Sequence, residues 1–174
     1  MGSADVTLYA QYFYAIGNIG PSGVGIVFDV TNDGLHGLEA APPLWNGGDD
    51  PTSAWITGGS TQTTANGHTL TGIGTGSANT DAIIAQPGET GSAAELCRAY
   101  TGGGKTDWFL PSYFELSKLY LQNAVVGGFP NIGTFYWSSS ESDTAQAIFV
   151  DFLSGNSNFS TKDSTLRVRP ARAF

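Results

Sequence analysis

The segment Gly103-Gly104-Lys105-Thr106 is the part of the sequence most similar to a chemical motif, the glycine-rich loop that holds nucleotide phosphates. That loop carries a further glycine five residues before the glycine that precedes the lysine. Here this place is taken by Ala99, and the segment leads into the apolar run Trp108-Phe109-Leu110 instead of opening a helix. The sequence therefore predicts no nucleotide site at Lys105.

Metal chemistry has few candidate ligands in this chain. His36 and His68 are the only imidazoles and Cys97 is the only thiol, so a zinc site with the usual four ligands is not expected. Paired acids such as Asp49-Asp50 have the oxygen atoms that calcium prefers. They lack the EF-hand spacing, however, and are more typical of solvated turns. We predict no metal and no cofactor.

Catalytic constellations are also missing from the sequence. The serine run 138–140 before Glu141 is not framed as a nucleophile elbow and has no histidine near it. The chain has fifteen acids, but nothing in their spacing selects the pair that a glycosidase needs. Cys97 lies among apolar residues at helical spacing, which favours a thiol packed in the core over a reactive thiol. The chain is therefore predicted not to be an enzyme.

Composition restricts the class of protein. The 174 residues include 24 glycines, 12% aromatic and only 13% charged residues, which is typical of a compact, loop-rich domain and not of a disordered chain or a coiled coil. No apolar run reaches the roughly 18 residues of a membrane span. Residues 1–97 hold nine acids and no basic residue, and the net charge is −8. A nucleic-acid partner, which requires a dense basic stripe, is not expected.

The first half of the chain predicts a hairpin and a long loop. Residues 25–30 and 35–40 flank the turn signal Asn32-Asp33-Gly34, so they are expected to pair as two strands. The irregular region 41–78 follows, and loops of that length are often functional. Trp45 and Trp55 lie in it and are expected to pin it to the core.

The second half predicts helices followed by strands. We expect helices over 80–84, capped by Thr80-Asp81, over 93–100, capped by Thr90 or Ser92, and from Ser112 to about Asn123, with Glu115 completing a capping box. Strands are expected over 135–140, 147–153 and 166–174. The order of strands, helices and strands argues for an α+β fold with an antiparallel sheet.

Three segments form an ordered series that is similar to a known family: Asp107-Trp108-Phe109-Leu110-Pro111-Ser112, Tyr136-Trp137-Ser138-Ser139-Ser140-Glu141 and Val168-Arg169-Pro170-Ala171-Arg172-Ala173-Phe174. Over about residues 14–174 the chain resembles the bacterial family typified by the C-terminal domain of the Legionella collagen-like adhesin. The resemblance implies an α+β, C-type-lectin-like fold with an antiparallel sheet, two to three helices and long irregular loops. Residues 1–13 are then an N-terminal extension, left from expression or from a stalk.

The resemblance also implies a function, that of a non-catalytic adhesin head. Such heads are trimers on a collagen-like stalk, secreted or held at the bacterial surface by the outer membrane without inserting into it, and they bind sulfated glycosaminoglycans of the host. Basic side chains would then bind sulfate, and amides of the 154–165 region would bind sugar hydroxyls. The expected ligand-binding residues are Lys105, Lys118, Lys162, Arg167 and Arg98 for sulfate, and Asn156 and Asn158 for sugar.

Calcium-bridged sugar binding is not expected from the same comparison. Gln86-Pro87-Gly88 and Trp45-Asn46-Gly47 each lack the acid that calcium-dependent lectins carry at the matching place.

An alternative function follows from the same resemblance. The scaffold also occurs in receptor-binding and display proteins diversified by retroelements, in which the region between the Trp-Ser-Ser-Ser-Glu and Val-Arg-Pro segments is varied. In this chain that region gives residues 139–165, which would contact a protein ligand. Arg169 and Arg172 follow it, and we expect them to pair with carboxylates or carbonyls at the edge of the core in preference to a ligand.

Overall fold

The computed structural model describes residues 13–57 and 70–174, so that His68 and nearly all of the expected extension lie outside the described residues. In these two ranges the chain forms eight strands: β1 (Ile26–Val30), β2 (Gly37–Ala40), β3 (Thr52–Ala54), β4 (Phe135–Glu141), β5 (Gln146–Asp151), β6 (Ser157–Thr161), β7 (Thr165–Arg167) and β8 (Ala171–Ala173). It also forms four α-helices and a 3₁₀ turn: α1 (Gly76–Ile84), α2 (Ala93–Ala99), α3 (Tyr113–Leu121), α4 (Asn123–Val126) and Gly102–Gly104.

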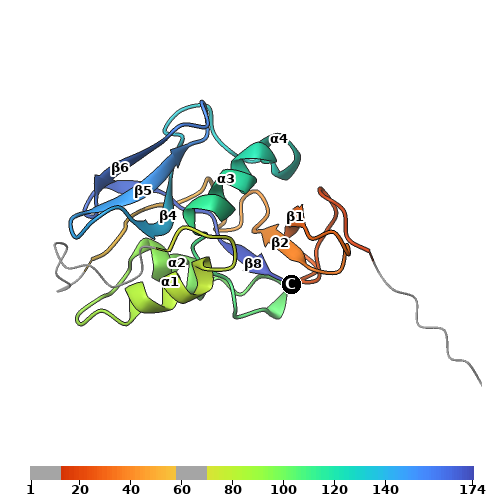
Figure 1. Cartoon of the computed structure of the whole chain (residues 1–174), viewed down its shortest axis with the longest axis horizontal. Helices are drawn as coiled ribbons and strands as arrows, with labels where there is room; N and C mark the ends of the chain where they lie inside the picture. The colour runs from red at the N-terminus through yellow and green to blue at the C-terminus, as the bar shows by residue number, and fades with distance from the viewer. Residues whose placement is uncertain (1–12, 58–69) are drawn as a thin grey trace, which may run out of the picture.

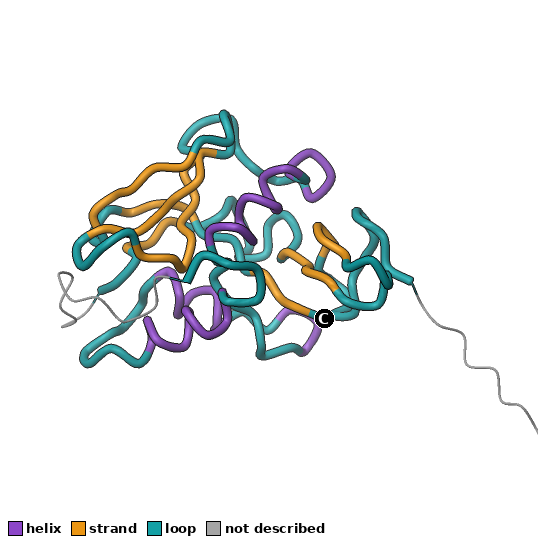
Figure 2. Tube along the Cα trace, viewed as in Figure 1, coloured by secondary structure: helices purple, strands orange, loops and turns teal. Residues whose placement is uncertain are grey.

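The strands form two sheets (Figures 1 and 2). The three-stranded sheet has the order β1-β2-β8 and is antiparallel, and the five-stranded sheet has the order β3-β7-β4-β5-β6. Helix α3 lies between the two sheets, and α1 and α2 lie beneath them in the view of Figure 1. The mixed arrangement confirms the α+β class and is consistent with a C-type-lectin-like fold.

Two hydrophobic cores lie on opposite faces of β4. Tyr136 faces the core that α3 shares with both sheets, and its neighbour Trp137 faces the core that α1 and α2 share with β4, because successive strand residues point to opposite faces. Cys97 is fully buried in the second core, which confirms its expected packing role, and burial raises the pKa of its thiol. Within the described ranges, no helix has the length and apolarity needed to cross a membrane.

Local signals correctly predicted the hairpin and two of the helices. β1 and β2 pair as expected. The N-cap of α2 is Ser92, whose hydroxyl accepts from the Glu95 amide at 3.3 Å. At α3 the Glu115 carboxylate accepts from the Ser112 amide at 2.7 Å while the Ser112 hydroxyl caps the helix in return, so the predicted capping box is present.

The start of α1 was predicted wrongly, and α4 was not predicted. α1 begins at Gly76 rather than at Thr80. The Thr80 hydroxyl is not a cap, because it donates to the Gly76 carbonyl at 2.8 Å and accepts from the Leu110 amide at 3.0 Å inside the protein. A buried hydroxyl satisfied by these partners is compatible with the middle of a helix.

The C-terminal segment, predicted as one strand, is divided between the two sheets. β7 pairs with β3 and β4, and β8 pairs with β2, so that Val168–Pro170 cross from one sheet to the other. The pairing of β4 with β7 is parallel, through Tyr136 and Arg167, whereas the other strand pairings are antiparallel, as expected. Arg169 lies in the middle of this crossing.

Candidate functional site

Lys162, expected to contact sulfate, is buried. Its side chain is 0% exposed and its ammonium lies 2.6 Å from a carboxylate oxygen of Glu141, which is also buried. The ammonium also donates to the Thr144 carbonyl at 3.0 Å and lies 4.9 Å from the ring centroid of Trp55. This burial corrects the sequence expectation, because a surface ligand does not reach an ammonium enclosed in this way.

Three further expected sulfate ligands are held by partners on separate elements. Arg98 of α2 pairs with an Asp81 carboxylate of α1, and Lys118 of α3 pairs with Asp29 of β1 at 2.7 Å. Arg167 of β7 donates to two backbone carbonyls, at 2.7 Å each. These cations lie on different elements, α2, α3 and β7, and within the described ranges no two of them share a hydrogen-bond or ion-pair partner.

Lys105 differs from the other basic residues. It is half-buried, and in the described part of the chain its ammonium has no ion pair and no hydrogen bond. It directly follows the 3₁₀ turn, and its backbone amide donates to the Gly102 carbonyl at 3.3 Å. Of the expected sulfate ligands, Lys105 is therefore the one whose head group has no described hydrogen-bond or ion-pair partner, although its charge acts on the nearby carboxylate of Asp107.

The expected sugar ligands Asn156 and Asn158 are both exposed. Asn156 lies in the turn between β5 and β6, and Asn158 lies on β6. Neither shares a described contact with Lys105, which lies at the end of the 3₁₀ turn. Within the described ranges, the structure therefore does not bring Lys105 together with the expected sugar ligands.

A pocket of about 420 Å³ adjoins the segment that leads to Lys105. It combines aromatic rings, an amide and a hydroxyl, and it is lined by Trp45, Asn46, Leu96, Ala99, Tyr100, Thr101 and Gly102. The rings of Trp45 and Tyr100 meet edge to face with centroids 5.3 Å apart. The ring centroids of Tyr100 and Trp108 are 5.0 Å apart. We call this the aromatic pocket.

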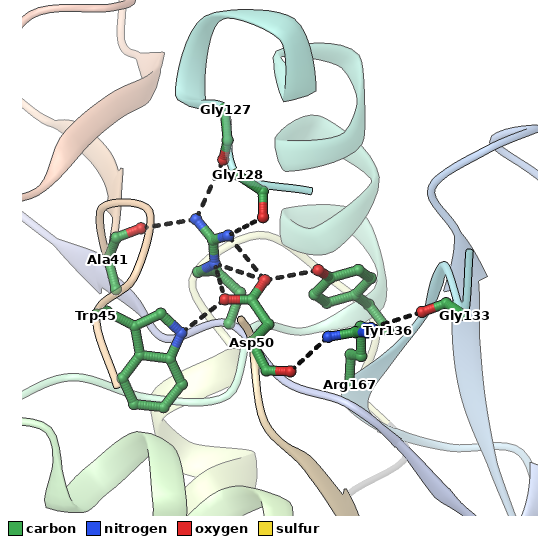
Figure 3. Close-up of polar contacts among 9 residues, drawn as sticks. Ala41, Trp45, Asp50, Gly127, Gly128, Gly133, Tyr136 and Arg167 are labelled. Atoms are coloured by element: carbon green, nitrogen blue, oxygen red, sulfur yellow. Dashed lines mark hydrogen bonds and ion pairs between the residues drawn. The ribbon is translucent and has the colours of Figure 1, made fainter. Parts of the chain in front are cut away.

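Asp50 fixes the indole of Trp45 from inside the protein (Figure 3). Its Oδ1 accepts from Trp45 Nε1 at 2.8 Å and its Oδ2 accepts from the Tyr136 hydroxyl at 2.6 Å. Burial and the Asp50 charge raise the pKa of Tyr136, so its hydroxyl stays protonated and donates. One wall of the aromatic pocket is therefore anchored by a buried carboxylate.

The charge of Asp50 is balanced by Arg169, and both side chains are 0% exposed. The guanidinium lies 2.7 Å from Oδ2 and also donates to the backbone carbonyls of Ala41 and Gly128, at 3.0 and 3.2 Å. Arg172 likewise pairs with Glu39, at 2.8 Å. The predicted structural role of these two arginines is confirmed.

The burial of Asp50 corrects the prediction from the sequence that Asp49 and Asp50 form a solvated turn. Asp49 is exposed, but Asp50 is buried. Trp45, by contrast, pins the loop to the core as predicted. In residues 13–57 and 70–174, no group of three or more His, Cys, Asp or Glu side chains is arranged to hold a metal ion.

The loop that ends at Lys105 depends on a close backbone approach. A Cβ on Gly103 would lie 1.9 Å from the Ser22 carbonyl oxygen, whereas a Cβ on Gly104 would meet nothing within 4 Å. Both residues have positive φ, +66° and +69°. We expect Gly104→Ala to cost about 1 kcal/mol of unfolding free energy from backbone strain. For Gly103→Ala we expect about 3 kcal/mol, because the contact with Ser22 adds overpacking.

Urea denaturation of both variants tests this difference. Gly104→Ala is the matched control, since it shares the strained φ but not the contact. Equal losses in the two variants would contradict the close approach to Ser22.

A family model described as the Lcl C-terminal domain matches residues 49–172. The chain belongs to this family. The match confirms the resemblance inferred from the sequence segments and makes the chain an adhesin-associated domain, in a family not known as catalytic. A search of curated proteins found no match.

The Lcl C-terminal domain match begins after the β1–β2 hairpin, but the structure packs that hairpin with the matched part. β2 pairs with β8, and Phe28 and Leu38 lie in the same core as Leu116 of α3. The match includes Tyr100 and Lys105, whereas Trp45 precedes it. The domain boundaries 14–174 remain a prediction.

Sequence analysis missed most of the aromatic pocket. It included Tyr100 only as the last residue of the helix 93–100, and gave Thr101 no role. The pocket joins residues 45–46 with residues 96–102. No pattern along the chain signals that these two segments meet.

Proposed function

We propose that this Lcl C-terminal domain is a non-catalytic adhesion domain that binds a carbohydrate in the aromatic pocket. The observation that carries the proposal is that two aromatic side chains, Trp45 and Tyr100, line one pocket, and that the segment after Tyr100 leads through the pocket residue Gly102 to a cation, Lys105. A surface setting, as in an adhesin of the bacterial exterior, belongs to the same proposal.

The chemistry of the pocket suits a sugar. The faces of pyranose rings are apolar and pack on aromatic side chains, while few placed polar groups orient a ligand in such a pocket. Asn46 and Thr101 supply an amide and a hydroxyl at the rim. The Lys105 ammonium would bind a sulfate or carboxylate substituent by a charge-assisted hydrogen bond.

The charge distribution limits the strength of one site. Lys105 is a single half-exposed cation in a chain of net charge −8, so its contribution to affinity is about 1 kcal/mol or less. Tight binding of a sulfated polymer would then require several copies acting together, as in the trimer that the resemblance implies.

A heparin tetrasaccharide and its desulfated counterpart test the proposal by isothermal titration at 50 mM salt. Trp45→Ala is expected to weaken both ligands at least tenfold, since it removes one aromatic wall. Lys105→Gln is expected to weaken only the sulfated ligand, by about threefold to fivefold, which corresponds to loss of one exposed charge contact.

Lys118→Gln is the matched control, because Lys118 is a partly exposed lysine paired with Asp29 on another element. Its affinity for both ligands should stay within twofold of the unsubstituted protein. The carbohydrate proposal is discarded if neither tetrasaccharide binds, or if Trp45→Ala binds both as well as the unsubstituted protein does.

A further inference from the structure

β6 is the outermost strand of the five-stranded sheet and is free on one side. It pairs with β5 over all five of its residues, and within the described ranges no strand pairs with its other edge. Four of the five residues are exposed, and Phe159 is exposed by 55%. β6 lies at the upper left of Figure 1, away from α1 and α2.

The outward backbone groups of β6 can be assigned from its pairing. The Asn156 carbonyl accepts from the Asp151 amide at 2.8 Å, and the Lys162 amide donates to the Ala145 carbonyl at 3.0 Å. Backbone groups alternate in direction along an antiparallel strand, so the even-numbered residues face β5. The amides of Ser157, Phe159 and Thr161 and the carbonyls of Ser157 and Phe159 therefore form the open edge, while the Thr161 carbonyl accepts from the Ser164 amide at 2.9 Å.

A side chain already occupies one of these outward donors. The Phe159 amide donates to the Asn158 side-chain oxygen at 2.9 Å, which agrees with an amide that points away from β5. The edge lacks the devices that usually block strand addition: β6 contains no proline and no lysine, and its pairing with β5 has no bulge. It is a strand that can accept another strand.

Charge around this edge favours a basic partner. Asp143 and Asp163 are exposed in the turns at one end of β6, and Asp151 is half-buried beside the other end. The basic residue in the region 139–165 is Lys162, which is buried and paired with Glu141. A second copy of this chain, with a net charge of −8, would bring further negative charge to an acidic edge.

We propose that the outer edge of β6 binds an extended, basic segment of a partner protein, which adds to the sheet as a further strand. Backbone hydrogen bonds to Ser157, Phe159 and Thr161 supply the attachment, and apolar side chains of the partner cover Phe159. Lysine or arginine side chains of the partner reach Asp143 and Asp163. This site shares no residue with the aromatic pocket, so each can fail without the other.

Selection of random ten-residue peptides displayed on phage tests the proposal. Selected peptides should carry lysine or arginine among β-branched residues. As synthetic peptides they should bind Phe159→Pro at least tenfold more weakly, because proline removes an outward donor that β5 does not use. Phe159→Ala is the matched control, which loses the ring but keeps the amide, and should lose fivefold or less.

A measurement on the unsubstituted protein covers the case in which Phe159→Pro does not fold. A bound peptide should slow hydrogen exchange at the outward amides of Ser157 and Thr161, while the Asn158 and Ser160 amides, already bonded to β5, should change little. The proposal is overturned if no peptide is enriched, if enriched peptides are acidic, or if they bind Phe159→Pro normally and leave exchange unchanged. If the protein instead forms a dimer that Phe159→Pro dissociates, the edge of β6 pairs with a second copy of this chain and not with a basic partner segment.

Discussion

Asp50→Ala is expected to lower the unfolding free energy by about 3 to 5 kcal/mol, because it leaves the guanidinium of Arg169 buried without its carboxylate. Both side chains are 0% exposed, so water does not replace the lost partner. The Tyr136 hydroxyl and the Trp45 indole lose their acceptor in the same step. A domain stabilised by about 5 to 15 kcal/mol would lose a large share of its stability.

Urea denaturation followed by tryptophan fluorescence measures this loss. Asp81→Ala is the matched control, because the carboxylate of Asp81 also pairs with an arginine but its side chain is 67% exposed. Its cost should be about 0.5 kcal/mol, as for surface ion pairs. A loss below 1 kcal/mol for Asp50→Ala would show that Arg169 does not depend on this carboxylate.

Lys162→Met is expected to cost about 3 kcal/mol, since it leaves the buried Glu141 carboxylate without the ammonium that lies 2.6 Å away. The double variant Glu141→Leu, Lys162→Met removes both charges, and its stability should return to within about 1 kcal/mol of the unsubstituted protein. Chemical denaturation of the single and double variants gives both values.

The same variant distinguishes a structural lysine from a sulfate ligand. Where the double variant is folded, its affinity for the heparin tetrasaccharide should equal that of the unsubstituted protein. Lys118→Met, which breaks a partly exposed pair with Asp29, is the control and should cost about 1 kcal/mol or less. Full stability of Lys162→Met together with loss of heparin binding would reinstate Lys162 as a ligand residue.

Much of the fold could be predicted because its signals are local. The capping box of Ser112 and Glu115, the N-cap Ser92 and the turn Asn32-Asp33-Gly34 each lie within a few residues of the element they start or join. Thr80 was misread because a threonine before an apolar pair resembles a cap. Its actual partner, Leu110, is 30 residues away.

The site could not be predicted in the same way, because exposure is decided by distant segments. Lys162 lies in a polar stretch that is typical of a surface turn, yet Glu141 and Trp55 enclose its ammonium. Asp50 lies beside another acid and glycines, but its partner Arg169 is 119 residues further on. The sequence shows that a side chain is charged, but it does not show which distant side chain pairs with that charge.

The crossing at Val168–Pro170 has a consequence for biosynthesis. β7 is inserted between β3 and β4, and β8 joins β2, so both sheets are completed by strands that follow all other described elements in the chain. A ribosome therefore delivers an inner strand of the five-stranded sheet, β7, after its neighbours β3 and β4 have emerged. Until then the nascent chain exposes unpaired strand edges, and it depends on chaperones or on rapid completion to avoid aggregation.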